Sequence, residues 1–264
     1  MAAPWADGGT YEFLMGRWSR SLAPRFVEWA RLPAHAEILD VGCGTGALCE
    51  ALARSGAQRV VGIDRAPGYV DHAASLVGRT HPQVTFKVGD AMQLPFPDNT
   101  FDAAVSGLVL NFVPDASIMV REMRRVARPG GIVAAYVWDY AERMELLRRF
   151  WDAAVALDPA AVKLDERLRF PICNPAALEK GFRNAPLSAV KTSHLDLPIV
   201  FRDFEDYWTP FLGGQGPSGG YAMSLSEESR SRLRERLRST LSAKPDGTIP
   251  MTLRAWTVKG AKRT

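Results

Sequence analysis

The sequence predicts an α/β protein built around a doubly wound sheet, and two observations support that prediction. Short runs rich in β-branched residues alternate with helical segments along most of the 264 residues. One such run, residues 37–41, passes directly into three glycines at alternate positions and then into a helical segment. Because no linker rich in Ser, Pro and Gly divides the chain, we expect one domain with a single large core.

Seven apolar runs fit strands of that sheet, at residues 37–41, 59–63, 84–88, 101–106, 131–138, 187–197 and 251–258. Helical periodicity fits segments between them, at residues 45–56, 67–78, 115–127, 142–157 and 175–183. Gly56 is the stop signal of the first helix. The run Pro129-Gly130-Gly131 ends the helix at 115–127 and turns the chain into the next strand.

Two segments lie outside this alternation. Apolar and aromatic residues between positions 10 and 32 recur with a helical period, so we expect one or two helices laid across the sheet. Residues 202–244 hold an aromatic cluster, a flexible glycine-rich loop at 213–220 and a basic helix. Since ligands of open α/β sheets bind at the carboxyl ends of the strands, we expect both segments to cover that edge, with residues 10–20 and 202–220 as a mobile part that becomes ordered when ligand binds.

The charge balance is mildly basic. The net charge is +4 and the isoelectric point is about 9.1, which permits nucleic-acid contact without requiring it. Five arginines gather between residues 230 and 238, where Leu233, Leu237 and Leu241 repeat every four positions. That pattern predicts an amphipathic helix with a solvated basic face, and a nucleic-acid or acidic-substrate surface is the alternative.

The cysteines and the amino terminus favour a cytoplasmic protein. Cys43, Cys49 and Cys173 are odd in number and lack metal-ligand spacing, so we expect small buried residues, no disulfide framework and no metal. Asp7 and Glu12 interrupt any signal-peptide run, and no stretch approaches the ~18 apolar residues of a membrane span.

The glycine turn is the most specific feature. A strand that breaks into glycines and then a helix offers free backbone N–H groups and the positive helix end to an anionic or strongly polar group. The spacing of Gly42, Gly44 and Gly46 differs from the G-x-G-x-x-G of dinucleotide-binding folds, and Asp40 stands where those folds place an apolar residue. A nicotinamide-dependent oxidoreductase would also need a pair such as Tyr-x-x-x-Lys, which the chain lacks.

Further candidate ligand contacts follow the next predicted strands. Asp64 ends the second strand, where a carboxylate accepts hydrogen bonds from both hydroxyls of a ribose, and a helix N-cap is the alternative role. Asp90 follows the third strand, with a plain Asx turn as the alternative. Gly107 ends the fourth strand and permits close approach of a ligand to the backbone.

The motif Asp-x-Gly-x-Gly-x-Gly at residues 40–46 resembles that of class I S-adenosylmethionine-dependent methyltransferases. Residues 94–102, Leu-Pro-Phe-Pro-Asp-Asn-Thr-Phe-Asp, are similar to the L-P-F-x-D-x-x-F-D segment of their type 11 family, which includes ubiquinone- and menaquinone-biosynthesis enzymes. The resemblance extends over residues 37–138, with weaker likeness at 11–18 and 204–208. It implies a Rossmann-like seven-stranded sheet with parallel strands, an antiparallel last strand, and a helical cover from the N-terminus and from an insertion before the last strand.

The resemblance also implies a cofactor, S-adenosyl-L-methionine, with S-adenosyl-L-homocysteine as product. It places Asp90 on the adenine amino group, the Ala91 N–H on a ring nitrogen and Leu108 near the sulfonium. The cofactor-binding residues that we expect are Tyr11, Arg17, Gly42, Cys43, Gly44, Gly46, Asp64, Arg65, Asp90, Ala91, Gly107 and Leu108. The residues expected to line the acceptor are Trp138, His194, Tyr207 and Trp208. His194 is the first candidate for a base, and no catalytic residue is assigned.

On this interpretation residues 1–32 form an N-terminal cover, 33–200 a cofactor-binding core, 201–247 an inserted cap and 248–264 the last strand. We expect a small-molecule acceptor, because Ser106-Gly107-Leu108-Val109 replaces the Asn/Asp-Pro-Pro-aromatic motif of amino-methylating nucleic-acid enzymes. A nucleic-acid methyltransferase and a non-catalytic S-adenosylmethionine-binding protein are the alternatives. The sequence leaves the acceptor, the methylated atom and the oligomeric state open.

Overall fold

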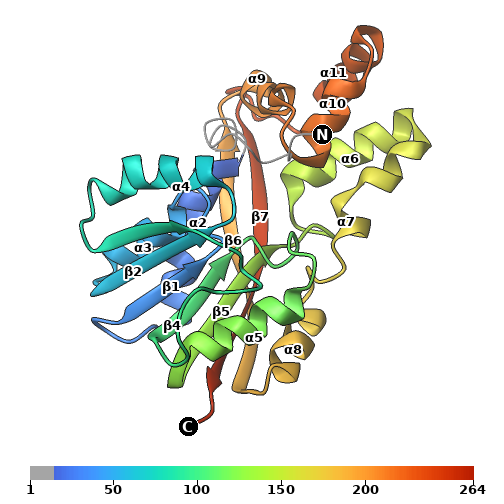
Figure 1. The fold of residues 1–264 in the computed structure, drawn as a ribbon. Helices are drawn as coiled ribbons and strands as arrows, with labels where there is room; N and C mark the ends of the chain where they lie inside the picture. Colours follow the sequence, from blue (N-terminus) through green and yellow to red (C-terminus); the bar gives the residue numbers. More distant parts are fainter. Residues whose placement is uncertain (1–14) are drawn as a thin grey trace.

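A seven-stranded sheet with helices on both faces organises the chain in the computed structural model, which describes residues 15–264 (Figure 1). The strand order is β3-β2-β1-β4-β5-β7-β6. Strands β1 to β5 are parallel, and β7 pairs antiparallel with both β5 and β6. The predicted sheet with its antiparallel last strand is therefore confirmed. The strands are β1 (Glu37–Val41), β2 (Arg59–Asp64), β3 (Val84–Val88), β4 (Phe101–Gly107), β5 (Ala127–Trp138), β6 (Leu187–Phe201) and β7 (Ile249–Lys262).

The central and edge strands differ in burial. Strands β1, β4 and β5 are covered on both faces, which is why their sequences are nearly continuous apolar runs. Strand β6 lies at one edge of the sheet, where Leu197, Ile199 and Phe201 are buried and alternate with exposed residues. Both β6 and β7 run a few residues past their predicted ends and stay paired up to Phe201 and Ile249.

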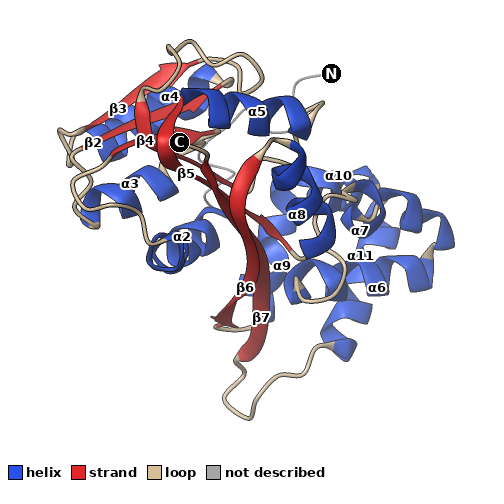
Figure 2. Ribbon diagram, turned by 90° about the horizontal axis from the view of Figure 1, so that it is seen from below, coloured by secondary structure: helices blue, strands red, loops and turns tan. Residues whose placement is uncertain are grey.

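Helices cover both faces of the sheet (Figure 2). Helices α2 and α3 pack together on one face, and α5 and α8 pack together on the other. The helices of the core are α2 (Arg17–Ala30), α3 (Ala47–Arg54), α4 (Pro67–Ala73) with the π-helical turn η2 (Ala74–Gly78), α5 (Ala116–Val126) and α8 (Pro175–Asn184). Helix α2 confirms a predicted N-terminal helix, and its Phe26 lies 4.5 Å from the ring of Tyr136 on β5. Residues 10–14 of the predicted cover lie outside the described residues.

A cap of short helices lies beyond the edge where the parallel strands end (Figure 1). It contains α6 (Glu145–Leu157), η3 (Pro159–Leu164), α7 (Glu166–Arg169), α9 (Phe204–Trp208), η4 (Thr209–Gly213), α10 (Gly216–Ser224) and α11 (Glu227–Thr240). The stacked rings of Phe150 and Phe211, 4.5 Å apart, join α6 to η4.

Two predictions about the cap have opposite outcomes. The flexible loop predicted at 213–220 is wrong, because the chain becomes helical from Gly216, and a Cβ on Gly219 would lie 2.9 Å from the Gly214 carbonyl carbon. Close backbone packing therefore explains the glycine there. The amphipathic basic helix is confirmed as α11, with Leu233 and Leu237 buried.

Across residues 15–264, none of the helices combines the length and the apolar character needed to cross a membrane. Within the same residues, no group of three His, Cys, Asp or Glu side chains has a metal-binding arrangement. The three cysteines are buried free thiols, as predicted.

Candidate functional site

Each glycine of the turn after β1 has a positive φ: 76° at Gly42, 51° at Gly44 and 89° at Gly46. Residues with a Cβ rarely adopt these angles. A Cβ on Gly42 would lie 2.4 Å from Val109 Cγ2, and one on Gly46 would lie 3.0 Å from Val77 Cγ2. A Cβ on Gly44 would meet no atom within 4 Å. Gly42 and Gly46 thus permit close packing, whereas Gly44 leaves open space.

The backbone N–H groups of the turn form hydrogen bonds within the protein. Gly42 N and Cys43 N donate to the Ile63 carbonyl at 2.7 and 3.0 Å, and Gly46 N donates to the Cys43 carbonyl at 2.9 Å. Gly44 N donates to Asp64 Oδ2 at 3.0 Å. These four N–H groups are therefore not free, contrary to the expectation for the turn, because the turn folds back onto the end of β2 and onto itself.

Asp64 connects the glycine turn to the start of α4. Its second oxygen, Oδ1, accepts a hydrogen bond from Ala66 N at 2.9 Å. Burial raises the pKa of this carboxyl, and the bonds from Ala66 and Gly44 oppose that rise. Since an ionised carboxylate offers about four acceptor positions, Asp64 retains capacity for ligand hydroxyls.

Asp40 on β1 is a fully buried carboxylate. Cys49 Sγ donates to its Oδ2 at 3.1 Å, while Oδ1 is buried without a partner in the part of the chain that the structure describes. Burial raises the pKa of Asp40 to about 7. A buried acceptor without a partner is costly, so the site favours a ligand that brings a donor or a positive charge.

A cavity of about 610 Å³ opens at the carboxyl ends of β1, β2, β4 and β5. This is the edge where the strand order reverses between β1 and β4, the usual ligand position in open α/β sheets. Two covering segments reach it, with Met15 and Ser19 from the N-terminal side and residues 215–218 from the cap. The cavity brings together these predicted site residues: Gly42, Cys43, Gly44, Asp64, Arg65, Asp90, Ala91, Gly107, Leu108 and Trp138.

Asp90 and the exit of β4 have defined local geometry. Asp90 Oδ1 accepts a hydrogen bond from Met92 N at 2.8 Å, so the Asx turn exists and the same residue lines the cavity. A Cβ on Gly107 would lie 2.5 Å from Tyr136 Oη. Leu108 has a φ of 64°, which is unusual for a residue with a side chain. Strained backbone of this kind is concentrated at ligand sites.

Several predicted site residues lie away from the cavity. Arg17 donates to Asp206 Oδ1 at 3.0 Å and so ties α2 to the cap. His194 is exposed on β6, 5.9 Å from the Trp256 ring. Tyr207 is fully buried and donates to the Leu146 carbonyl at 3.0 Å, and Trp208 packs in the same aromatic cluster of the cap. Gly46 contacts η2. Tyr11 lies outside the described residues.

The sequence analysis missed one wall of the cavity. Asn111, Tyr140, Glu166, Arg169 and Phe170 all line it, and three of them come from the segment around α7, for which no element was predicted. The ring of Phe170 lies 5.1 Å from that of Phe112 and 5.2 Å from that of Tyr140. The only available signal was the run Glu-Arg-Leu-Arg-Phe, which has no recognisable motif.

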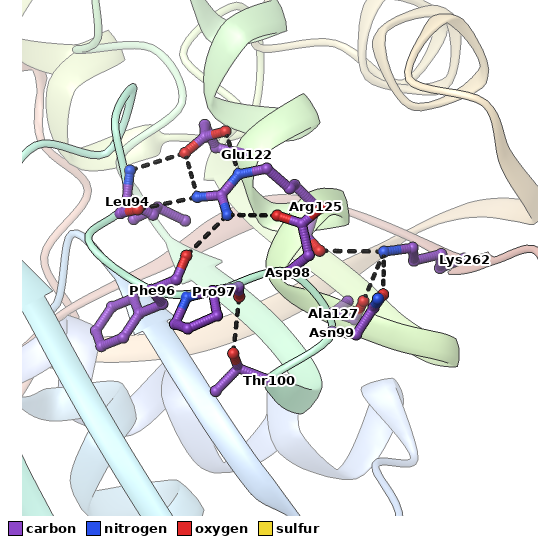
Figure 3. A network of polar contacts seen from close by, with 10 residues as sticks. All are labelled: Leu94, Phe96, Pro97, Asp98, Asn99, Thr100, Glu122, Arg125, Ala127 and Lys262. Atoms are coloured by element: carbon purple, nitrogen blue, oxygen red, sulfur yellow. Dashed lines mark hydrogen bonds and ion pairs between the residues drawn. The ribbon is translucent and has the colours of Figure 1, made fainter.

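The Leu-Pro-Phe-x-Asp segment has a structural role (Figure 3). The Arg125 guanidinium of α5 donates to the carbonyls of Leu94 and Phe96 at 2.9 and 2.7 Å, and to Asp98 Oδ1 at 2.9 Å. Glu122 holds the same guanidinium at 2.7 and 2.8 Å, which raises the pKa of Arg125 and lowers that of Glu122. The motif therefore fixes the path from β3 to β4.

Comparisons with known proteins agree with this geometry. Residues 39–135 match the sequence model of a type 11 family described as a methyltransferase domain. The chain is 37% identical to 2-methyl-6-phytyl-1,4-hydroquinone methyltransferase of Synechocystis sp., over 47% of this chain and 39% of that protein. It is 40% identical to demethylmenaquinone methyltransferase of Bacillus licheniformis, over 40% of this chain and 47% of that protein. The chain thus spans less than half the length of these relatives.

Solved structures share the fold. Phosphoethanolamine N-methyltransferase 2 of Haemonchus contortus, in complex with S-adenosyl-L-methionine, superposes with a TM-score of 0.60 and 17% identity over 97% of this chain and 57% of that chain. This likeness shows that the chain shares the fold of that enzyme. The family resemblance therefore rests on residues 39–135, which match the model of the type 11 methyltransferase domain.

Proposed function

We propose that the chain transfers a methyl group from S-adenosylmethionine to a small-molecule acceptor by in-line displacement. The observation that carries the proposal is the continuity of the cavity from the glycine turn and Asp64 to the aromatic wall of Trp138, Tyr140 and Phe170. One space therefore serves both a cofactor and an acceptor. The relatives named above, which are named as methyltransferases of 2-methyl-6-phytyl-1,4-hydroquinone and of demethylmenaquinone, support the same interpretation.

The residues present fit the cofactor. The unpaired Oδ1 of Asp40 and the spare acceptor capacity of Asp64 suit a ligand that carries an ammonium group and ribose hydroxyls. The open space at Gly44 suits close approach to the backbone. S-adenosylmethionine, when bound, supplies a sulfonium methyl group that an acceptor atom can displace. The protein's own contribution is to align the acceptor and to exclude water.

The cap supports a small acceptor in preference to a nucleic acid. Arg230 donates to the Ala222 and Leu225 carbonyls at 2.9 Å each, and Arg234 and Arg238 both bind Glu205. These three arginines of α11 hold the cap together, which reduces the basic surface left for phosphates. We also propose that residues 15–19 and 215–218 act as the cover of the cavity.

The test is methyl transfer from isotopically labelled S-adenosylmethionine into a metabolite extract, read by mass spectrometry. We expect the label in a product with the mass of a small molecule and not in a macromolecule. Binding to mixed tRNA and duplex DNA is measured in parallel as salt rises from about 50 to 200 mM, where contacts to phosphates weaken steeply. Submicromolar affinity that persists at the higher salt would favour a nucleic-acid acceptor instead.

A further inference from the structure

One buried acid of the cavity has no part in the cofactor contacts proposed above. Glu166 opens α7, is 3% exposed and lines the cavity. Its Oε2 accepts a hydrogen bond from Trp151 Nε1 of α6. Since buried carboxylates are normally paired with cations, Glu166 requires an explanation.

The preceding residue shows what full pairing looks like. Asp165 is completely buried, and Arg148 binds both of its oxygens at 2.6 and 2.9 Å. Arg167 adds an ion pair at 3.1 Å. Glu166 accepts a hydrogen bond from a neutral indole N–H, whereas Asp165 is paired with two guanidinium groups. Two adjacent buried acids therefore have contrasting environments, an arrangement by which enzymes separate structural acids from acid–base groups.

Two charged groups and one further aromatic ring surround Glu166 and its partner Trp151. Arg148 faces Glu166 from α6, Asp165 precedes it, and Tyr221 of α10 packs its ring 5.6 Å from that of Trp151. Burial raises the pKa of Glu166 to about 7, with a further rise from the Asp165 charge and opposing effects from Trp151 and Arg148. Near neutral pH this group can therefore both accept and release a proton.

The wall beside Glu166 suits a flat aromatic ring with a polar substituent. Phe112, Tyr140 and Phe170 pack edge to face or tilted, with ring centroids 5.1 to 5.2 Å apart. Asn111 lines the same cavity, and both of its amide atoms are buried without a partner among the described residues. An apolar aromatic surface with an unpaired amide and a buried acid that has no cation bound to it favours an acceptor that offers both a ring and a hydroxyl group.

We propose that Glu166 is the general base of the methyl transfer and that the acceptor is an aromatic ring bearing a hydroxyl group. This inference rests on the proposed function. The hydroxyl O–H bond breaks as its proton moves to a Glu166 oxygen, and the acceptor oxygen forms a bond to the methyl carbon. The carbon–sulfur bond breaks with its electron pair left on sulfur, so the sulfonium becomes a neutral thioether. Glu166 then releases the proton to solvent when the product leaves.

The test compares the parent chain with Glu166→Gln, using 1-naphthol and 1,4-dihydroxynaphthalene as acceptor probes. The amide retains the volume and the acceptor for Trp151 but cannot take a proton. We expect kcat to fall by about 10²- to 10⁴-fold. Affinity for S-adenosylmethionine, measured by calorimetry, should stay within about twofold, since Glu166 contacts the acceptor side. Glu179→Gln, on the exposed ion pair with Arg183, is the matched control and should leave kcat unchanged.

The pH profile separates a base from a structural role. For the parent, kcat should rise with pH through about 7 and level off, because only the ionised Glu166 accepts a proton. Glu166→Gln should lose that inflection. Trp151→Phe removes the donor that lowers the Glu166 pKa, so its inflection should move to higher pH.

Three outcomes overturn the proposal. They are unchanged kcat in Glu166→Gln, an inflection that survives in that variant, and a parent chain that binds S-adenosylmethionine but methylates neither probe. Failure of the parent to bind S-adenosylmethionine would instead overturn the proposed function itself, so the two failures are distinguishable.

Discussion

Replacing Asp40 by Asn should make the ligand-free protein more stable at pH 8 while weakening its affinity for S-adenosylmethionine. The pKa of Asp40 rises from an ordinary 3.8 to about 7 on folding because the carboxyl is buried. At about 1.4 kcal/mol for each pKa unit, its ionisation costs the folded state about 4 kcal/mol above pH 7. The folded state binds the proton more tightly, so stability falls as pH rises between 3.8 and 7.

The variant removes that pH-dependent cost. Its buried amide leaves a donor unpaired, which costs about 1–3 kcal/mol at every pH. We therefore expect Asp40→Asn to be about 1–3 kcal/mol more stable than the parent at pH 8 and close to it at pH 5. The loss of the unpaired carboxylate oxygen should weaken cofactor binding, a typical exchange of stability for function.

Urea unfolding at pH 5 and pH 8 measures this difference directly, because the free energy of unfolding varies linearly with denaturant. Asp196→Asn is the matched control. The Arg254 guanidinium lowers the pKa of Asp196 below 3.8, so that variant should lose stability by the same amount at pH 5 and at pH 8, because the parent carboxylate is ionised at both. A stability difference between Asp40→Asn and the parent that does not change with pH would refute the reasoning.

Three further variants test the packing around the site. Gly42→Ala should cost about 1–3 kcal/mol and abolish cofactor binding, since its Cβ would clash with Val109; calorimetry showing parental affinity would contradict this. Arg125→Gln should cost about 1–3 kcal/mol in urea unfolding by freeing the segment between β3 and β4, and an unchanged midpoint would argue against the clamp. Arg148→Met should lower the free energy of unfolding by about 3–5 kcal/mol, because it leaves the Asp165 charge buried without its main partner. A loss below about 1 kcal/mol would show that Arg167 alone compensates the Asp165 charge.

The sequence predicted the sheet well because the signal for each strand is local. Strand β1 matches its predicted span of 37–41, where a short apolar run suits a strand covered on both faces. Strand β3 matches 84–88 at the edge of the sheet, where β-branched and aromatic residues predict a strand although most of them are not buried. The prediction of a flexible loop at 213–220 was wrong because a glycine-rich sequence has two possible explanations. Flexibility and close packing leave the same sequence pattern, and at Gly219 the packing applies.

The candidate site was predictable mainly on its cofactor side, and Trp138 is the member of the predicted acceptor-lining set that the cavity contains. Gly44, Asp64 and Asp90 follow strands whose carboxyl ends meet at one edge, so their meeting follows from topology. The opposite wall is assembled by tertiary packing of short helices. Glu166 lies at the cavity because α7 is held against α6, where Trp151 donates a hydrogen bond to it. No sequence spacing relates Glu166 to the glycine turn.

The free N–H groups expected in the glycine turn illustrate a different limit. The sequence indicates that a turn is present, but not where its donors point. In the structure the end of β2, including Asp64, and the Cys43 carbonyl accept them, so we propose that Asp40, Asp64 and the open space at Gly44 provide the ligand contacts near this turn. The residue types predicted where the candidate site lies. The hydrogen bonds of the structure then showed that N–H groups expected to be free are engaged within the protein.

Calorimetric titration with S-adenosylmethionine, S-adenosylhomocysteine and NAD tests the central claim most directly. The account predicts saturable binding of the first two ligands and none of NAD. In Asp64→Ala the loss of charge-assisted hydrogen bonds should weaken binding by about 1.5–3 kcal/mol, or on the order of 10- to 150-fold. Binding of NAD, with no heat from either sulfur ligand at millimolar concentration, would contradict the account.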